Sequence, residues 1–463
     1  MRTNIGRAVL VAAGVLVSCS STQPPVLALV SPDRGFSTTA SFTLTARGSN
    51  FQNDSQIVFN QRAKATTFVS ATELACTITP SDMTATPGPS QIVAVPVYVA
   101  TPQTANSGSL DFSIAIYPRF PAASKIADST TSYSDTLHPL IRIDAAGQLD
   151  VVWRDQRKLL FSFSRDGGAR WSPPEIIHES PASSYRFSAS VDRSSPVILV
   201  AWEEDSAIAL IRSTDSGQTW SSPAALTSAA TISASNPGML VDPSGTIFVA
   251  YLGSSPRGGG SYAVVILRSS DHGASFRQVG RIPWSTYFVG ETSPQLGVDK
   301  TGVLYLVFTS ELGTRYSTSY LASSTDGGLN WSTPSRVSLA APSLAVDDRD
   351  AVDVVGANMY LPYQYSLTFM RSTDRGGSWA SHEFEGTSYS VSDIVVNAFG
   401  STDLVWANRF VRSFDHGSTW GPIVDYADEG EADQPSFVED SSGRIYIAWW
   451  DPSGGIYFKA SGT

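Results

Sequence analysis

Charged residues follow aromatic residues at several places in the chain, a combination suited to binding or cleaving sugars. Aromatic faces stack on sugar rings, carboxylates bind hydroxyl groups, and two suitably paired carboxylates act as general acid and base. An arginine fork is the natural partner of a ligand carboxylate, which makes Arg157 the first residue to test. The candidate ligand-binding residues are Asp155, Arg157, Glu203, Trp153, Trp202, Trp406, Trp449 and Asp451.

Other kinds of catalytic site leave little trace in the sequence. Five histidines without a close pair argue against a zinc site. Neither a Gly-x-Ser-x-Gly nucleophile motif nor a phosphate-binding loop is present. The turn Asp242-Pro-Ser-Gly245 could suggest calcium, but an isolated turn aspartate mostly caps the backbone. We therefore expect no metal ion and no cofactor.

Six copies of the pattern Ser-x-Asp-x-Gly-x-x-Trp indicate the elements that position the candidate residues; only the third copy ends in Phe276 instead of Trp. The aspartate accepts hydrogen bonds from nearby N–H groups, the glycine takes a positive φ, and the aromatic covers the turn, so the pattern predicts a structural role. Copies recur about every 40–55 residues, the length of a four-stranded propeller blade. The six aspartates are Asp166, Asp215, Asp271, Asp326, Asp374 and Asp415.

These repeats resemble the Asp-box, or BNR, repeats of sialidase-type β-propellers, over about residues 120–463. The resemblance is specific for fold and weak for function, because the family's Asp boxes lie away from the active site and occur in propellers that catalyse nothing. In such a propeller the loops after the aromatics open on the face opposite the Asp boxes. The alternative interpretation is that the aromatics wedge neighbouring blades apart and the charges form a solvated rim.

A second repeated signal, upstream of the boxes, allows the blades to be counted. Units such as Pro139 to Gly147 place Asp five residues and Gly eight residues after a proline, and two degenerate copies complete a series of seven. The seventh unit stops at Ser461-Gly-Thr463, where its own Asp box should begin, so it lacks a fourth strand. Ser124-Lys-Ile126-Ala resembles Ser335-Arg-Val337-Ser after the fourth box and is predicted to supply that strand and close the ring. We expect seven blades, and six, the number in true sialidases, is the alternative.

The chain departs from the catalytic pattern that the resemblance implies. Retaining sialidases share an arginine triad, a Tyr nucleophile activated by Glu, and an Asp acid/base. Leu137 stands where the first arginine should precede Pro139. Arg281-Ile-Pro283 spells part of the arginine motif but lies out of frame, as expected of an outer strand. No catalytic residue is carried over, and whether the protein is an enzyme stays open.

The N-terminus has the pattern of an export signal. A short basic segment precedes an apolar run of about ten residues, which is too short to span a bilayer as a helix. Leu16-Val-Ser-Cys19 follows and resembles a bacterial lipobox, which implies cleavage before Cys19 and a diacylglycerol anchor on its sulfur. An ordinary signal peptide with an incidental cysteine is the alternative. We expect a signal over residues 1–18 and a linker over 19–23, in a protein exported and lipid-anchored to the cell envelope, at the outer membrane or cell surface.

Residues 24–117 have a different texture, rich in Thr, Ser and Val, with about six short strands separated by turns. This spacing suggests a β-sandwich. Gly48-Ser-Asn-Phe51, Val58-Phe-Asn60, Ala71-Thr-Glu-Leu74 and Ser109-Leu-Asp-Phe112 resemble the IPT/TIG immunoglobulin-like domain, which usually serves as a spacer or contact module. The fold expected is therefore all-β, with an Ig-like sandwich followed by a propeller over residues 118–463.

The net charge of −11 and the absence of a basic run argue against nucleic acid as a partner. Two functions remain. The first is a non-catalytic envelope lipoprotein whose propeller binds a carbohydrate or protein ligand, with the membrane contacted only through the lipid. The alternative is an exo-acting glycoside hydrolase of sialidase-like type. Carboxylates paired at glycosidase spacing would favour the enzyme, and an aromatic shelf without such a pair would favour the binder.

Overall fold

The computed structural model describes residues 23–37, 41–84, 92–128, 139–180, 186–229, 232–255, 262–284, 292–311, 317–360, 364–384, 392–397, 400–428, 432–452 and 454–462. The regular elements of these residues are β-strands, which confirms the all-β prediction. The described residues up to Ile116 form one compact unit, and those from Tyr117 onward form a second. No helix long and apolar enough to cross a membrane occurs in the described ranges.

The first unit is a sandwich of two sheets. Strands β7 and β8 show how the sequence builds it, because alternate residues such as Leu74, Cys76, Val97 and Val99 are buried in the shared core. Burial raises the pKa of the Cys76 thiol to about 11, which keeps it protonated. In order across each sheet, the strands are β1 (Val26–Ser31), β3 (Phe42–Ser49), β7 (Glu73–Ile78) and β6 (Thr66–Ser70), then β2 (Arg34–Phe36), β9 (Leu110–Ala115), β8 (Ile92–Ala100), β4 (Gln56–Phe59) and β5 (Arg62–Ala63).

In the described part of the second unit, the strands form seven four-stranded antiparallel sheets, here called blades 1 to 7. Seven is also the number of repeat units in the sequence. From the innermost to the outermost strand the blades are β11 (Leu140–Ile143), β12 (Leu149–Asp155), β13 (Lys158–Ser164), β14 (Glu175–Glu179); β15 (Phe187–Val191), β16 (Ile198–Glu204), β17 (Ala207–Ser213), β18 (Ala224–Ala225); β19 (Ser233–Val241), β20 (Ile247–Ser254), β21 (Tyr262–Ser269), β22 (Arg277–Trp284); β23 (Gln295–Val298), β24 (Leu304–Glu311), β25 (Ser317–Ser324), β26 (Ser335–Arg336); β27 (Ala340–Val346), β28 (Val352–Tyr360), β29 (Gln364–Ser372), β30 (Ala380–Phe384); β31 (Ser392–Val396), β32 (Thr402–Trp406), β33 (Arg409–Ser413), β34 (Val424–Asp425); and β35 (Asp433–Glu439), β36 (Ile445–Asp451), β37 (Gly455–Ala460), β10 (Ser124–Asp128).

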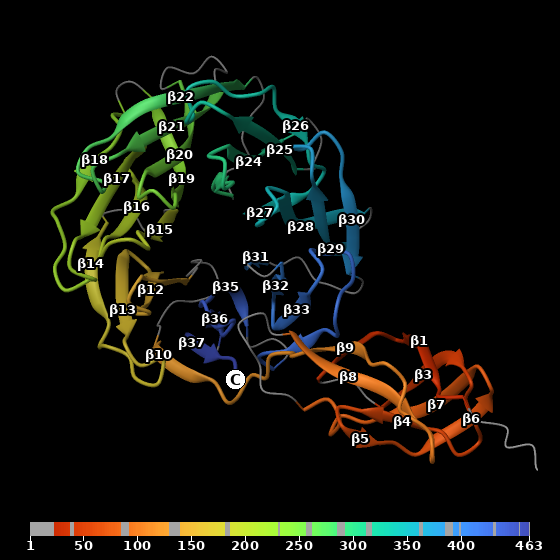
Figure 1. The fold of residues 1–463 in the computed structure, drawn as a ribbon. Helices are drawn as coiled ribbons and strands as arrows, with labels where there is room; N and C mark the ends of the chain where they lie inside the picture. Colours follow the sequence, from red (N-terminus) through yellow and green to blue (C-terminus); the bar gives the residue numbers. More distant parts are fainter. Residues whose placement is uncertain are drawn as a thin grey trace, which may run out of the picture. The chain divides into compact units, whose positions relative to one another are not determined.

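The blades form a closed ring (Figure 1). Their innermost strands contact one another in sequence order, and β11 of blade 1 also contacts β35 of blade 7. The outermost strand of blade 7 is β10, which pairs antiparallel with β37 in a register that places Ser124 opposite Phe458. The predicted closure by Ser124 to Ala127 is therefore confirmed. It unites the two ends of the propeller in one sheet and leaves β37 no open edge.

The segment that leads into β10 is itself fastened to blades 6 and 7. The Tyr117 hydroxyl accepts a hydrogen bond from the Arg412 N–H at 2.9 Å and donates one to the Pro422 carbonyl at 2.5 Å. The Phe120 ring packs edge-on against Phe410 with centroids 5.5 Å apart. The segment thus contacts blade 6 before its chain enters blade 7.

Each Asp box is a self-contained turn between the third and outermost strands. In the first copy, Ser164 Oγ accepts the Gly168 N–H at 2.8 Å and donates to Asp166 Oδ1, which accepts the Arg170 N–H at 2.8 Å. The same serine and aspartate bonds recur in the other five copies. Hydrogen bonds from the Arg170 side chain and backbone lower the pKa of Asp166 to about 2. These carboxylates are thus committed to their own turns.

A buried charged cluster joins blades 6 and 7. Arg412 is fully buried, and its guanidinium grips both oxygens of Asp403 at 2.6 and 2.5 Å while its Nη2 lies 3.3 Å from Glu439 Oε1. Asn397 Nδ2 donates to the same Glu439 oxygen at 3.0 Å. Burial raises the pKa of Glu439 to about 7. One cation therefore balances two buried carboxyl groups, one of which titrates near neutral pH.

Candidate functional site

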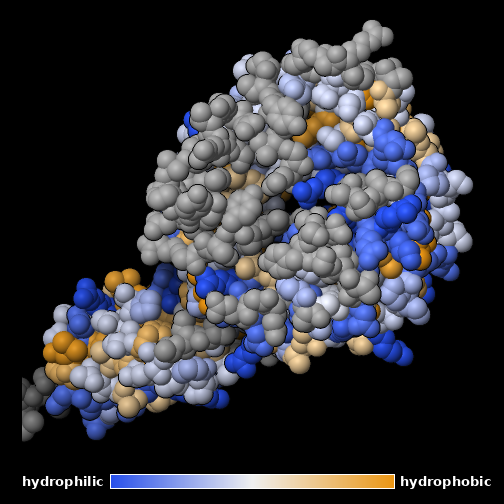
Figure 2. Space-filling view, turned by 180° about the vertical axis from the view of Figure 1, so that it is seen from behind, coloured by the Kyte–Doolittle hydropathy of each residue, from blue (hydrophilic) through white to orange (hydrophobic). Residues whose placement is uncertain are grey.

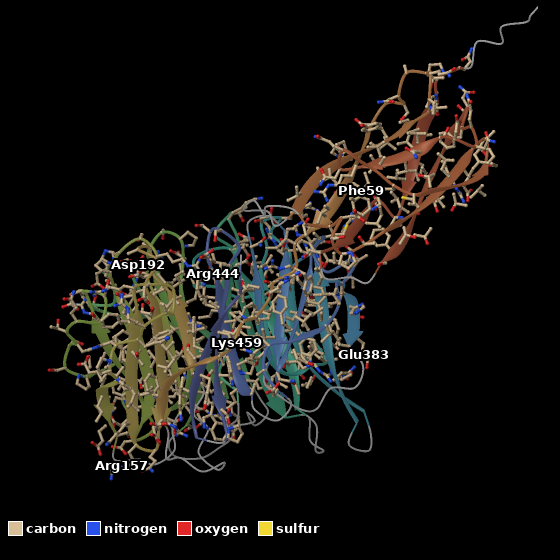
Figure 3. All side chains as sticks on the ribbon, turned by 90° about the horizontal axis from the view of Figure 1, so that it is seen from below. Phe59, Arg157, Asp192, Glu383, Arg444 and Lys459 are labelled. Atoms are coloured by element: carbon tan, nitrogen blue, oxygen red, sulfur yellow. The ribbon has the colours of Figure 1, made fainter. Side chains whose placement is uncertain are left out.

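The two ends of the ring differ in the side chains they carry. Arg157, at the hairpin between the second and third strands of blade 1, lies at one end, whereas Asp192 and Arg444 lie at the other, with the Asp boxes (Figure 3). We call the end that carries Arg157 the open face. Figure 2 looks onto this face and shows a hollow near the centre of the ring, with hydrophilic residues beside it.

The four candidate tryptophans are packing residues. Trp153, Trp202, Trp406 and Trp449 are at most 2 % exposed. Each meets a neighbouring blade: the Trp406 ring, for example, lies 5.6 Å from Phe384 of blade 5, and the Trp449 ring lies 5.4 Å from Tyr426, which follows β34 of blade 6. The hypothesis that they stack on sugar rings is therefore corrected, because rings filling the space between two sheets have no face left for a ligand.

Blade 5 has Gly356 where the other blades have this aromatic. A Cβ on Gly356 would lie 2.8 Å from the Ala340 carbonyl oxygen and 3.2 Å from the Leu339 Cβ. Strand β27 carries an irregularity between Ala340 and Ser343 that brings its backbone to this position. Backbone thus replaces the aromatic side chain at this junction.

Arg157 and Asp155 belong to one hairpin of blade 1. Arg157 is exposed, but its Nε donates to the Ser180 carbonyl at 2.8 Å, and the Ser180 N–H returns a bond to the Arg157 carbonyl. Asp155 is half-buried at the end of β12. Asp451 is buried at the end of β36 in blade 7, where it raises the pKa of Lys125 electrostatically as a minor contribution behind the Asp128 hydrogen bond. These three candidates thus lie on two neighbouring blades.

Glu203 faces a different neighbour. It ends β16 of blade 2, and its Oε2 accepts the backbone N–H of Asn236 in blade 3 at 3.4 Å. The side chain is half-buried, and desolvation raises its pKa although Arg186 acts in the opposite direction. A half-buried carboxyl of raised pKa at the end of a blade strand is a candidate for ligand binding or acid chemistry.

The sequence analysis missed a histidine–glutamate pair between blades 1 and 2. His178 Nε2 lies 3.1 Å from Glu204 Oε1, and the His178 ring packs on Trp202 with centroids 4.3 Å apart. Strand β14 carries His178 and β16 carries Glu204. No local motif marks this pair, because it depends on how the outermost strand of one blade meets the second strand of the next.

One group of possible metal ligands occurs in the described residues, at the Asp-box end of the ring. Asp347, Asp348 and His416 offer atoms within 4.8 Å of one another. Asp347 Oδ2 already accepts hydrogen bonds from the Arg371 guanidinium and from His416 Nδ1, so its negative charge is balanced by protein. We interpret the group as a contact between blades 5 and 6, not as a metal centre.

Comparisons with known proteins agree with this architecture. The BNR repeat-like domain matches residues 195–447, and the IPT/TIG domain matches residues 25–114. No curated protein is a significant match. Similar solved structures include the lectin BP39L from Burkholderia pseudomallei, which has 16% sequence identity and a TM-score of 0.50 and covers 70% of this chain and 98% of its own.

Two further structures are enzymes. A PL25 polysaccharide lyase, an ulvan lyase bound to -[GlcA(1-4)Rha3S]-, has 12% identity and a TM-score of 0.50 and covers 74% of this chain and 96% of its own. The Hadza microbial sialidase Hz136 has 14% identity and a TM-score of 0.48 and covers 95% of this chain and 93% of its own. At these identities the likeness concerns the fold. Because the repeat match spans more than half of the chain, the protein belongs to the BNR repeat-like domain family, with an IPT/TIG domain ahead of its repeats.

Proposed function

We propose that the protein is a carbohydrate-binding lipoprotein of the bacterial cell envelope, and that its ligand binds on the open face of the propeller. The observation that carries this proposal is Glu203, a half-buried carboxyl that has a single long hydrogen bond within the described residues. Lectin BP39L and the ulvan lyase support a carbohydrate ligand, because both have this fold and their names specify carbohydrate recognition. The candidate residues Asp155, Arg157 and Asp451 complete the polar groups at this end of blades 1 and 7.

A glycan array probed with the soluble chain from Ser20 onward tests this function. We expect a defined set of glycans to be retained, and we expect Asp242→Asn, at the Asp-box end, to retain the same set. Retention of no glycan by a chain that melts cooperatively would contradict carbohydrate binding and favour a protein ligand.

Glycoside hydrolysis is the second candidate, favoured by the raised pKa of Glu203, which is a property of general acids. Incubating the retained glycans with the protein and analysing the products by mass spectrometry separates the two functions. Intact glycans are expected of a binder, and shortened glycans of a hydrolase.

The lipid anchor rests on Leu16-Val-Ser-Cys19, which lies outside the described residues. We expect the wild-type chain to incorporate labelled palmitate and to fractionate with membranes, and Cys19→Ser to lose both properties while remaining exported. The reason is that two acyl chains on one residue suffice for stable anchoring. Membrane fractionation of Cys19→Ser at the wild-type level would contradict the anchor.

A further inference from the structure

Strand β19 of blade 3 carries a bulge that is held from two sides. Its register with β20 shifts between Ser235 and Gly238, and Asn236 within the bulge has a φ of 52°. Asparagine tolerates this left-handed conformation better than most residues, although the following Pro237 makes it costly. A Cβ on Gly238 would lie 1.7 Å from the Pro294 carbonyl oxygen, so only glycine allows this approach between blades 3 and 4. The bulge is a built feature, of the kind that re-aims groups beside binding sites.

The bulge brings together groups from three consecutive blades. The Asn236 N–H points to Glu203 Oε2 of blade 2, and Asn236 Nδ2 donates to the carbonyl of Thr292, just before β23 of blade 4, at 3.2 Å. Thr292 Oγ1 is buried and has no hydrogen-bond partner among the described residues. A carboxylate and a hydroxyl with unused hydrogen-bonding capacity therefore flank Asn236.

Glu203 has more acceptor capacity than this arrangement uses. An ionised carboxylate offers about four acceptor sites. Within the described residues, the single hydrogen bond to its side chain is the 3.4 Å contact from Asn236, and Arg186 adds a favourable charge without a hydrogen bond to it. Leaving a partly buried polar group unpaired costs about 1–3 kcal/mol, which hydroxyl groups of a ligand would offset.

We propose that Glu203 binds two neighbouring hydroxyls of an uncharged sugar, one at each carboxylate oxygen, with Thr292 Oγ1 available to a third ligand group. This inference rests on the proposed carbohydrate function and names its ligand class. An uncharged sugar fits because Glu203 repels an acidic group and already balances the positive charge of Arg186. Arg157, the natural partner of an acidic sugar, is bound to Ser180 in blade 1.

The decisive variants are Glu203→Gln and its neighbour Glu204→Gln. Both remove one negative charge and keep the side-chain shape, but Glu204 faces His178 of blade 1, not Asn236. For an uncharged glycan taken from the array, we expect Glu203→Gln to weaken binding about 10–100-fold, the value of hydrogen bonds to a charged acceptor. We expect Glu204→Gln to stay within about threefold of the wild type. Thermal melting of both variants confirms the fold.

Two measurements on the wild-type chain make the test independent of mutant folding. A ligand lacking one hydroxyl of the recognised pair should bind about tenfold more weakly to the wild type and equally to Glu203→Gln. Since burial raises the pKa of Glu203, wild-type affinity should fall on acidification at a higher pH than an exposed glutamate would give, whereas Glu203→Gln should show no such step.

The outcomes separate this inference from the function on which it rests. Preference for acidic glycans, or wild-type affinity in Glu203→Gln, would overturn the assignment to Glu203 and leave carbohydrate binding standing. Failure of the wild type to retain any glycan would overturn the proposed function itself.

Discussion

Replacing Ser124–Asp128 by glycine and serine residues, five in all, is expected to abolish cooperative unfolding of the propeller and to cause aggregation. The segment supplies the outermost strand of blade 7, and Ile126 is buried with Ile456 and Trp153 in the core shared by blades 7 and 1. Its loss exposes the edge of β37, and an unpaired strand edge is a template for association with other chains. Circular dichroism melting and size-exclusion chromatography measure the two effects.

A permuted chain provides the control for this experiment. In it, the same five residues are removed from their natural place and appended after Gly462 through a flexible linker, so that β37 regains a partner. We expect recovery of a cooperative melting transition. A melting curve of the Gly/Ser variant that matches the wild type would show that the pairing of β10 with β37 does not hold the ring closed.

The second large effect is expected for Arg412→Met, which should lower the free energy of unfolding by about 3–5 kcal/mol. The substitution keeps much of the side-chain volume but leaves Asp403 and Glu439 buried without their common cation. Burial already raises the pKa of both carboxyl groups, which shows how costly their charges are in this position. Urea titration at pH 7 measures the change.

Asp150→Asn is the matched control, because Asp150 occupies the position in β12 that Asp403 occupies in β32. It hydrogen-bonds Gln148 instead of an arginine, and desolvation raises its pKa to about 8. A carboxyl with a raised folded-state pKa stabilises the fold at low pH, and this contribution is lost as pH rises through the folded-state value. We expect Asp150→Asn to cost under about 1 kcal/mol at pH 7 and to remove part of the wild-type loss of stability near pH 8. An Arg412→Met variant as stable as Asp150→Asn would contradict the assigned role of the buried cluster.

The sequence predicted those parts of the fold that depend on local, repeated bonding. The Ser164 and Asp166 bonds lie within a few residues of each other, so the same pattern marks every Asp box. The closing strand was found because Ser124 to Ala127 resembles the outer-strand segment at Ser335. The ligand-stacking role of Trp153 was wrong because an aromatic at a strand end reads the same whether it faces solvent or the next blade.

The candidate site depends on contacts that no local pattern carries. Glu203 was selected because it follows Trp202, but its bond to Asn236 requires the bulge in β19 and the approach of Gly238 to Pro294. His178 meets Glu204 only because blade 1 packs on blade 2. Register between sheets follows from packing of whole blades, and residue spacing within one repeat does not encode it.

The attachment of Tyr117 and β10 decides how the propeller responds to mechanical load. Tension transmitted along the chain from preceding residues reaches the ring first at Tyr117, whose hydroxyl bonds belong to blade 6, and then at β10, whose ladder belongs to blade 7. Blade 7 has no Asp box of its own. The junction that bears the pull is therefore spanned by the very segment that transmits it. Stretching this protein by its N-terminal side should load the Tyr117 bonds and the β10–β37 ladder before any other blade, so that rupture begins where the ring was closed.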